Sequence, residues 1–117
     1  MKLLSTVAST VATLLLTNTA VEAKPFLYLS TFSYSGTYQT CISQAEDVLK
    51  KFNFEDFEYD KNNEKDRLVA ISGYHKDEFM SVQIECDQKM GITSFGIAGL
   101  DNDTTYEFYK KIHDAEW

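Results

Sequence analysis

Positive charge, proline and cysteine are all scarce in this 117-residue chain. Eleven Lys and Arg against 18 Asp and Glu give a formal net charge of −7, which disfavours nucleic acid and anionic lipid surfaces as partners. A single proline and the lack of repeats or Gly/Ser-rich runs exclude a linker between domains. The sequence therefore predicts one small acidic domain. Its charge can serve solubility, and it leaves a basic protein or peptide as the possible partner.

Residues 1–23 have the pattern of a secretory signal peptide. A lysine at position 2 precedes an apolar segment over residues 3–16, and small residues lie just before Lys24. The strongly apolar part is shorter than the roughly 20 residues that a membrane-spanning helix needs. We therefore expect cleavage before Lys24 and a secreted or periplasmic domain over residues 24–117, with no stable membrane anchor.

The spacing of apolar residues predicts two helices and five strands. Aromatic and β-branched residues at alternate positions indicate strands over 26–34, 54–60, 67–75, 78–86 and 92–99. A three-and-four spacing indicates a helix from 37 to 52, and a second helix follows a cap at Asp103 or Thr104. The order is β-α-β-β-β-β-α. It favours an α+β fold, with an antiparallel sheet of four to five strands and both helices on one face.

The two cysteines, Cys41 and Cys86, are even in number and belong to an exported chain, which favours one disulfide. Cys41 falls on the apolar stripe of the first predicted helix, and Cys86 falls on the apolar face of a predicted strand. Their wide separation excludes a Cys-x-x-Cys redox site. We expect the bond to tie the helix to the sheet.

A weak resemblance at the level of the fold follows from these features. The chain resembles small secreted bacterial proteins of unknown function that carry a signal peptide, one helix cysteine and one strand cysteine. The matching residues are Cys41, Val69, Ser72, Gly73, the run VQIEC that ends at Cys86, and Ala98-Gly99-Leu100-Asp101. The resemblance implies the disulfide and a compact fold, and it implies no catalytic residue.

Catalytic and metal-binding patterns are sparse. His75, Asp77 and Glu78 could ligate a divalent metal only with a further ligand from elsewhere, and their spacing matches no established set. We expect His75 to lie on a solvated hairpin turn. No Gly-x-Ser-x-Gly sequence occurs, and the disulfide would occupy both thiols. The sequence thus predicts no metal, no cofactor and no enzyme activity.

The segment over residues 54–60 combines aromatic rings with carboxylates, as recognition surfaces do. In a regular strand the candidate binding residues Phe54, Asp56, Glu58 and Asp60 share one face, opposite the other two aromatic residues. Phe54 should then be the most exposed aromatic residue of the segment.

The leading hypothesis is a non-enzymatic module that binds a protein or peptide. One alternative is an inhibitor of a basic exported hydrolase such as lysozyme, because Ser35-Gly36-Thr37-Tyr38 is similar to the Ser-Gly-x-x-Tyr motif of some lysozyme inhibitors. The other alternative is a small metal-assisted hydrolase that uses His75, Asp77 and Glu78.

Overall fold

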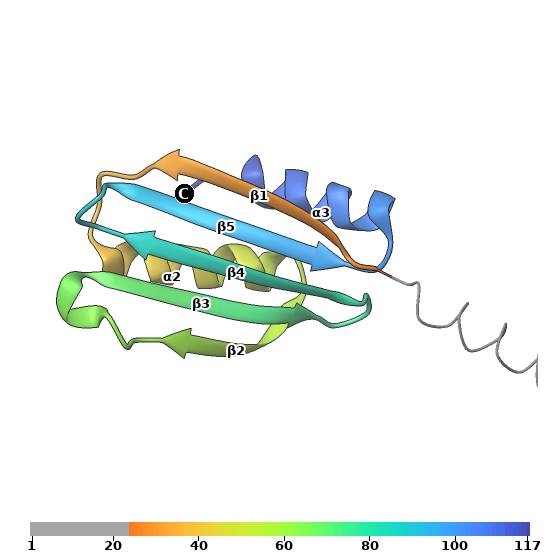
Figure 1. The fold of residues 1–117 in the computed structure, drawn as a ribbon, viewed down its shortest axis with the longest axis horizontal. Helices are drawn as coiled ribbons and strands as arrows, with labels where there is room; N and C mark the ends of the chain where they lie inside the picture. Colours follow the sequence, from red (N-terminus) through yellow and green to blue (C-terminus); the bar gives the residue numbers. More distant parts are fainter. Residues whose placement is uncertain (1–23) are drawn as a thin grey trace, which may run out of the picture.

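One antiparallel sheet of five strands organises the protein in this computed structural model, which describes residues 24–117. The strands are β1 (Phe26–Ser33), β2 (Phe54–Asp60), β3 (Leu68–His75), β4 (Met80–Asp87) and β5 (Ile92–Gly99). Their order across the sheet is β1-β5-β4-β3-β2, so that β2 to β5 form a meander and β1 pairs with the last strand (Figure 1). The predicted α+β fold and its element order are confirmed. The predicted signal peptide, residues 1–23, lies outside the described residues.

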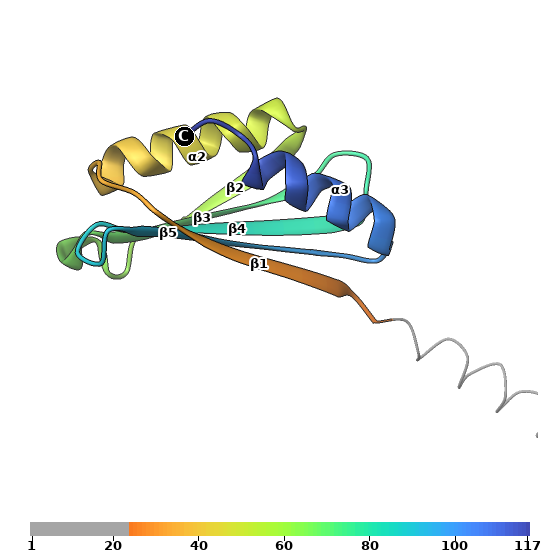
Figure 2. The same ribbon diagram turned by 90° about the horizontal axis from the view of Figure 1, so that it is seen from above.

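Both helices lie on the same face of the sheet (Figure 2). The first, α2 (Tyr38–Lys51), packs on β2, β3 and β4, and the second, α3 (Asn102–His113), packs on β1 and β5. A short 3-10 turn, η1 (Glu64–Asp66), lies between β2 and β3. Neither helix is long and apolar enough to cross a membrane, a finding that concerns residues 24–117 only. The opposite face of the sheet, which no helix covers, is called the open face below.

Side-chain caps fix where each helix begins. The hydroxyl of Thr37 accepts a hydrogen bond from the backbone N–H of Thr40 at 3.2 Å, and α2 follows. At α3 the carboxylate of Asp101 accepts a hydrogen bond from the N–H of Thr104 at 2.9 Å. The predicted cap at Asp103 or Thr104 is therefore wrong. Asp101 has the extended backbone of a cap residue, and its carboxylate lies three residues before the donor it satisfies.

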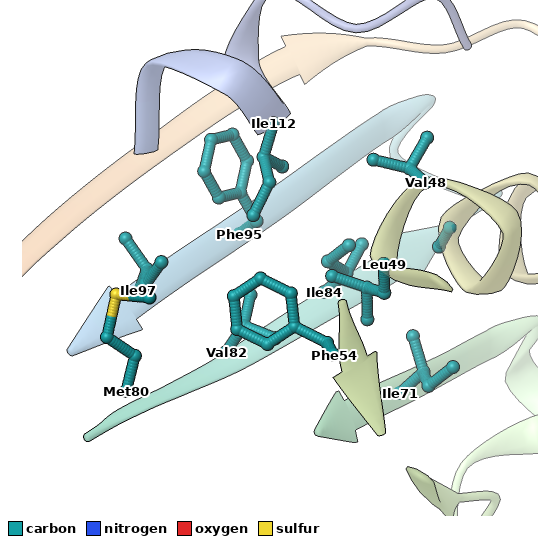
Figure 3. Packing of buried hydrophobic residues seen from close by; sticks show 11 residues of the cluster. Val48, Leu49, Phe54, Ile71, Met80, Val82, Ile84, Phe95, Ile97 and Ile112 are labelled. Atoms are coloured by element: carbon teal, nitrogen blue, oxygen red, sulfur yellow. The ribbon is translucent and has the colours of Figure 1, made fainter. Parts of the chain in front are cut away.

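The hydrophobic core fills the space between the helices and the sheet. Side chains alternate along each strand, and in β4 the residues Met80, Val82, Ile84 and Cys86 face the helices and are buried. Leu49 of α2 and other apolar residues meet them from the helix layer and the neighbouring strands (Figure 3). Burying each such side chain contributes about 1.5–3 kcal/mol.

A disulfide joins the two layers. Cys41 of α2 and Cys86 of β4 are bonded, with their Cα atoms 6.1 Å apart, and both side chains are buried. The predicted bond is thus confirmed, and no free cysteine occurs in residues 24–117. Because the bond closes a loop with a sequence separation of 45, it restricts the unfolded chain and holds α2 against the sheet.

A β-bulge near the start of β2 reverses the predicted arrangement of that strand. Asp56 has a left-handed backbone with φ of 55°, and the register of β2 against β3 shifts between Glu55 and Glu58. The extra residue resets the alternation of side chains, so Phe54 and Phe57 both pack against the core. Phe54 is only 2% exposed, and the expectation that it would be the most exposed aromatic residue of the segment is wrong.

His75 is part of the packed interior of its turn. It is 9% exposed, and its Nδ1 accepts hydrogen bonds from the backbone N–H groups of Asp77 at 3.1 Å and Glu78 at 3.2 Å. The ring also packs edge-on against Phe54 and Phe108. The expectation of a solvated residue is wrong, because the alternation of β3 carries position 75 to the helix face.

The disulfide leads to the first prediction. Reduction should lower the free energy of unfolding by up to about 4 kcal/mol, since the unfolded chain regains the freedom that the bond removes. Urea unfolding with and without reductant measures the difference, and thiol counting under denaturing, non-reducing conditions should find no free sulfhydryl. A Cys41→Ala/Cys86→Ala variant is the control, because its stability should not respond to reductant. Two free thiols in the untreated protein would contradict the prediction.

The two histidines form a matched pair for a second prediction. His75→Ala should lower the free energy of unfolding by about 2–4 kcal/mol, because two amides lose their acceptor and two rings lose a packing partner. His113→Ala should change it by less than about 0.5 kcal/mol, since that side chain is exposed at the end of α3. Urea unfolding of both variants measures the two changes in the free energy of unfolding. Equal effects would show that the His75 contacts do not stabilise the turn.

Candidate functional site

The open face is built from alternate positions of all five strands. The pairing of the strands arranges its side chains in rows that run from β2 to β1. Three of these rows are Glu55-Tyr74-Ser81-Ala98-Leu27, Glu58-Ser72-Gln83-Gly96-Leu29 and Asp60-Ala70-Glu85-Ser94-Thr31. Each row begins with a carboxylate at the β2 edge and ends with a leucine or threonine on β1. The face is therefore graded from acidic to apolar.

No lysine or arginine stands in these three rows of the described strands. They hold four carboxylates, from Glu55, Glu58, Asp60 and Glu85, and Asp87 follows Glu85 on the same face of β4. The helix layer carries basic residues at the ends of both helices, where cations complement the helix dipole. The helices also carry acids, Glu46 and Asp47 on α2 and Asp103 and Glu107 on α3, so charges of both signs lie on the helix layer, whereas the three rows of the open face hold carboxylates alone.

A depression of about 550 Å³ lies at the centre of the open face. Small residues form its floor, and Leu27, Leu29, Tyr74 and Glu85 are among the larger side chains around it. The depression depends on Gly96, because a Cβ atom at that position would lie 2.7 Å from Cδ2 of Leu29. Because Gly96 has no side chain, the side chain of Leu29 can pack over β5, and the centre of the open face stays hollow.

A smaller depression of about 130 Å³ adjoins the first on the β2 side. Glu58 and Asp60 line it, and it shares Ser72 and Gln83 with the larger one. A ligand that fills both depressions would meet apolar side chains at one end and carboxylates at the other.

The apolar end of the open face is well exposed. Leu27 is 61% and Leu29 is 69% exposed, and Tyr74 is exposed on the other side of the larger depression. Single exposed apolar residues are ordinary on protein surfaces, but grouped ones around a hollow mark a binding surface. The open face therefore offers both parts of a recognition site, apolar contact area and a charge of one sign.

Tyr59 fastens the acidic edge strand to the helix layer. Its hydroxyl donates a hydrogen bond to Oε1 of Glu46 on α2, and Nζ of Lys50 lies 3.3 Å from the other carboxylate oxygen. Burial, and then this bond to the Glu46 carboxylate, raise the pKa of Tyr59 to about 12. The same bond, followed by the contact with Lys50, lowers the pKa of Glu46. Tyr59 points toward the helices, so Glu58 and Asp60 on either side of it face the open side.

The structure divides the four predicted binding residues. Glu58 and Asp60 lie on the open face, and Asp56 is exposed within the bulge. Phe54 lies in the core and is not available to a partner.

Sequence reasoning missed the contributions of Leu27, Leu29, Tyr74 and Glu85 to the open face. The signal was present, because each of them occupies a position that alternates with half-buried residues in β1 or with buried residues in β3 and β4.

The residues of the two alternative hypotheses have structural roles. Thr37 caps α2, and a Cβ atom at Gly36 would lie 2.7 Å from the ring of Tyr34, so the Ser35–Tyr38 stretch shapes the entry to a helix. Nδ1 of His75 is taken by backbone amides. Within residues 24–117, no three His, Cys, Asp or Glu side chains lie close enough together to hold a metal ion.

Comparison of the chain with protein-family models, curated proteins and solved structures finds no match.

The contact between Tyr59 and Glu46 gives a third prediction. Glu46→Gln removes the negative charge beside the phenol, so the pKa of Tyr59 should fall from about 12 toward its ordinary value of 10.0. A raised pKa means that the contact stabilises the fold fully below pH 10.0 and loses this effect as the pH rises through about 12. Ring-carbon chemical shifts of tyrosine, followed against pH, measure the change.

Asp47→Asn is the matched control, because it removes the neighbouring carboxylate of α2. The control should leave the titration of Tyr59 unchanged. If Glu46→Gln also leaves it unchanged, Glu46 does not hold the phenol.

Proposed function

We propose that this protein is an exported, non-enzymatic binding module that holds a cationic protein or peptide segment on its open face. The observation that carries the proposal is the graded open face, with four carboxylates in three rows, no basic residue among them, and exposed leucines at the opposite end. A ligand with both basic and apolar side chains complements this surface.

The spacing of the sheet sets the shape of the ligand. Neighbouring strands lie about 4.8 Å apart, so β4, which carries Glu85, is roughly 10 Å from β1. Glu58 and Asp60 on β2 lie roughly 19 Å from β1 by the same measure. A segment that places an apolar side chain between the leucines and Tyr74 would therefore bring a basic residue to Glu85 and a second one to the β2 edge.

Export is part of the proposal. A buried disulfide between α2 and β4 is typical of an oxidising compartment and supports a secreted or periplasmic location. An acidic recognition face also suits a partner that arrives by diffusion, because opposite charges raise the rate of encounter.

Inhibition of a basic exported hydrolase such as lysozyme would be a special case of the same binding mode. It would use the carboxylates of the open face, because the Ser35–Tyr38 stretch serves to start α2. Lysozyme is therefore one probe in the test below, and loss of its activity on cell walls distinguishes inhibition from simple binding.

The fourth prediction tests the proposal with a synthetic peptide of alternating lysine and valine, about eight residues long, as an extended cationic ligand. Glu58→Lys combined with Glu85→Lys should raise its dissociation constant by about tenfold or more, because two attractions become repulsions. Asp47→Lys is the control for a charge reversal outside the open face. It reverses one exposed acid of α2, on the other layer, and should leave binding within about twofold of the wild type.

Calorimetry at low and moderate salt measures the constants, and affinity should fall as salt is added. If Asp47→Lys weakened binding as much as the open-face variant does, binding would depend on net charge alone, and a site on the open face would be refuted. Absence of binding to both the peptide and lysozyme would refute a cationic ligand.

A further inference from the structure

The two outer edges of the sheet differ in how they meet solvent. An edge strand presents unpaired backbone N–H and C=O groups, and proteins protect such edges with charges, bulges or short strands. β2 has these protections, since Glu55, Asp56, Glu58 and Asp60 line it and its register is broken by a bulge. A second strand is thereby discouraged from pairing with β2.

β1 has none of these protections. It is eight residues long, it carries no charged residue, and it pairs with β5 at every position without a register shift. Within residues 24–117, no strand pairs with its outer side. Leu27 and Leu29 are also well exposed at this edge. Such a long, regular and uncharged edge is a template for another strand.

The distribution of charge indicates that a second copy of this chain supplies the strand that pairs with β1. The net charge of −7 would ordinarily keep two copies apart. The edge carboxylates, however, stand on β2, four strand spacings or about 19 Å from β1, which exceeds the screening length of about 8 Å at physiological salt. Two copies can therefore meet at β1 without strong repulsion.

We propose that β1 pairs antiparallel with β1 of a second copy, so that two domains form one ten-stranded sheet around a two-fold axis. The axis keeps the two open faces on the same side, and the leucines at positions 27 and 29 of both copies meet at the seam. The outer edges of this dimer are the two protected β2 strands, so the assembly closes and does not grow into a fibre.

The pairing would place two acidic ends on one continuous face, with an apolar strip between them. This inference does not depend on the cationic ligand proposed above, since it is tested without any ligand. β1 carries no charged residue that could select a strand of another protein. A second β1, by contrast, brings leucines that can pack against the leucines of the first.

The experiment is sedimentation of the full chain, expressed with its own residues 1–23 in a host that exports it, over a hundredfold range of concentration. The wild-type protein should sediment with twice the mass of one chain at the upper end. Leu29→Lys should raise the dissociation constant of the dimer by about tenfold or more, because two like charges then lie close together at the seam and the leucine contacts are lost. Phe79→Lys is the control, at an 83% exposed residue before β4, and should leave the dimer unchanged.

Hydrogen exchange locates the contact and also checks that Leu29→Lys still folds. In the dimer the amides on both sides of β1 should be protected, and in Leu29→Lys only those that pair with β5 should remain so, with the core strands unaffected. A wild-type protein that stays monomeric throughout would overturn the inference. So would a dimer that Leu29→Lys leaves intact, growth beyond a dimer, or pairing of β1 only with a strand of a different protein.

Discussion

The constraint on which this structure depends is that two short helices can cover only one face of the sheet. The helices have 14 and 12 residues, or about 21 and 18 Å in length, and both lie on one face over strands that span about 27 Å. All large buried apolar side chains of the sheet must then come from one set of strand positions, and they meet the apolar side chains of the helices. The disulfide between Cys41 and Cys86 reinforces this arrangement, because it binds the longer helix to the central part of the sheet.

One-sided coverage also separates the positions that set stability from those of the proposed recognition face. The positions that face the helices hold the core, so a change there alters packing on both layers. Positions on the open face contact no helix, and most of their side chains are small or polar. Surface changes at such positions usually alter stability by about 0.5 kcal/mol or less. The open face can therefore carry carboxylates, which the core could not accept, together with leucines that stay exposed.

Local patterns were sufficient to predict the elements and the disulfide, because apolar spacing depends on neighbouring residues alone. β2 and β5 have the predicted bounds, and Cys86 occupies the buried side that the alternation of β4 indicates. The bulge at Asp56 could not be predicted in this way, since it depends on whether the core has room for both Phe54 and Phe57.

The turn at His75 depends on contacts that the spacing of residues does not encode. Its Nδ1 finds two backbone amides only after the chain has bent, and its ring finds Phe108 only after α3 has docked. The graded open face depends likewise on the strand order, because the rows of side chains exist only once β1 lies beside β5. The sequence predicted the acids of β2 but not their partners across the sheet.

The contrast between the two edge strands completes this picture. β2 combines a bulge, a row of acids and the bond from Tyr59 to Glu46, so its position is held and its outer side is unattractive to other strands. β1 is regular and uncharged, and the only strand that pairs with it in residues 24–117 is β5. If charge served solubility alone, it would be spread over both edges. Among the five strands, carboxylates occur only on β2 and β4, so one edge and one face differ in chemistry from the others, and this asymmetry supports the direction of binding proposed above.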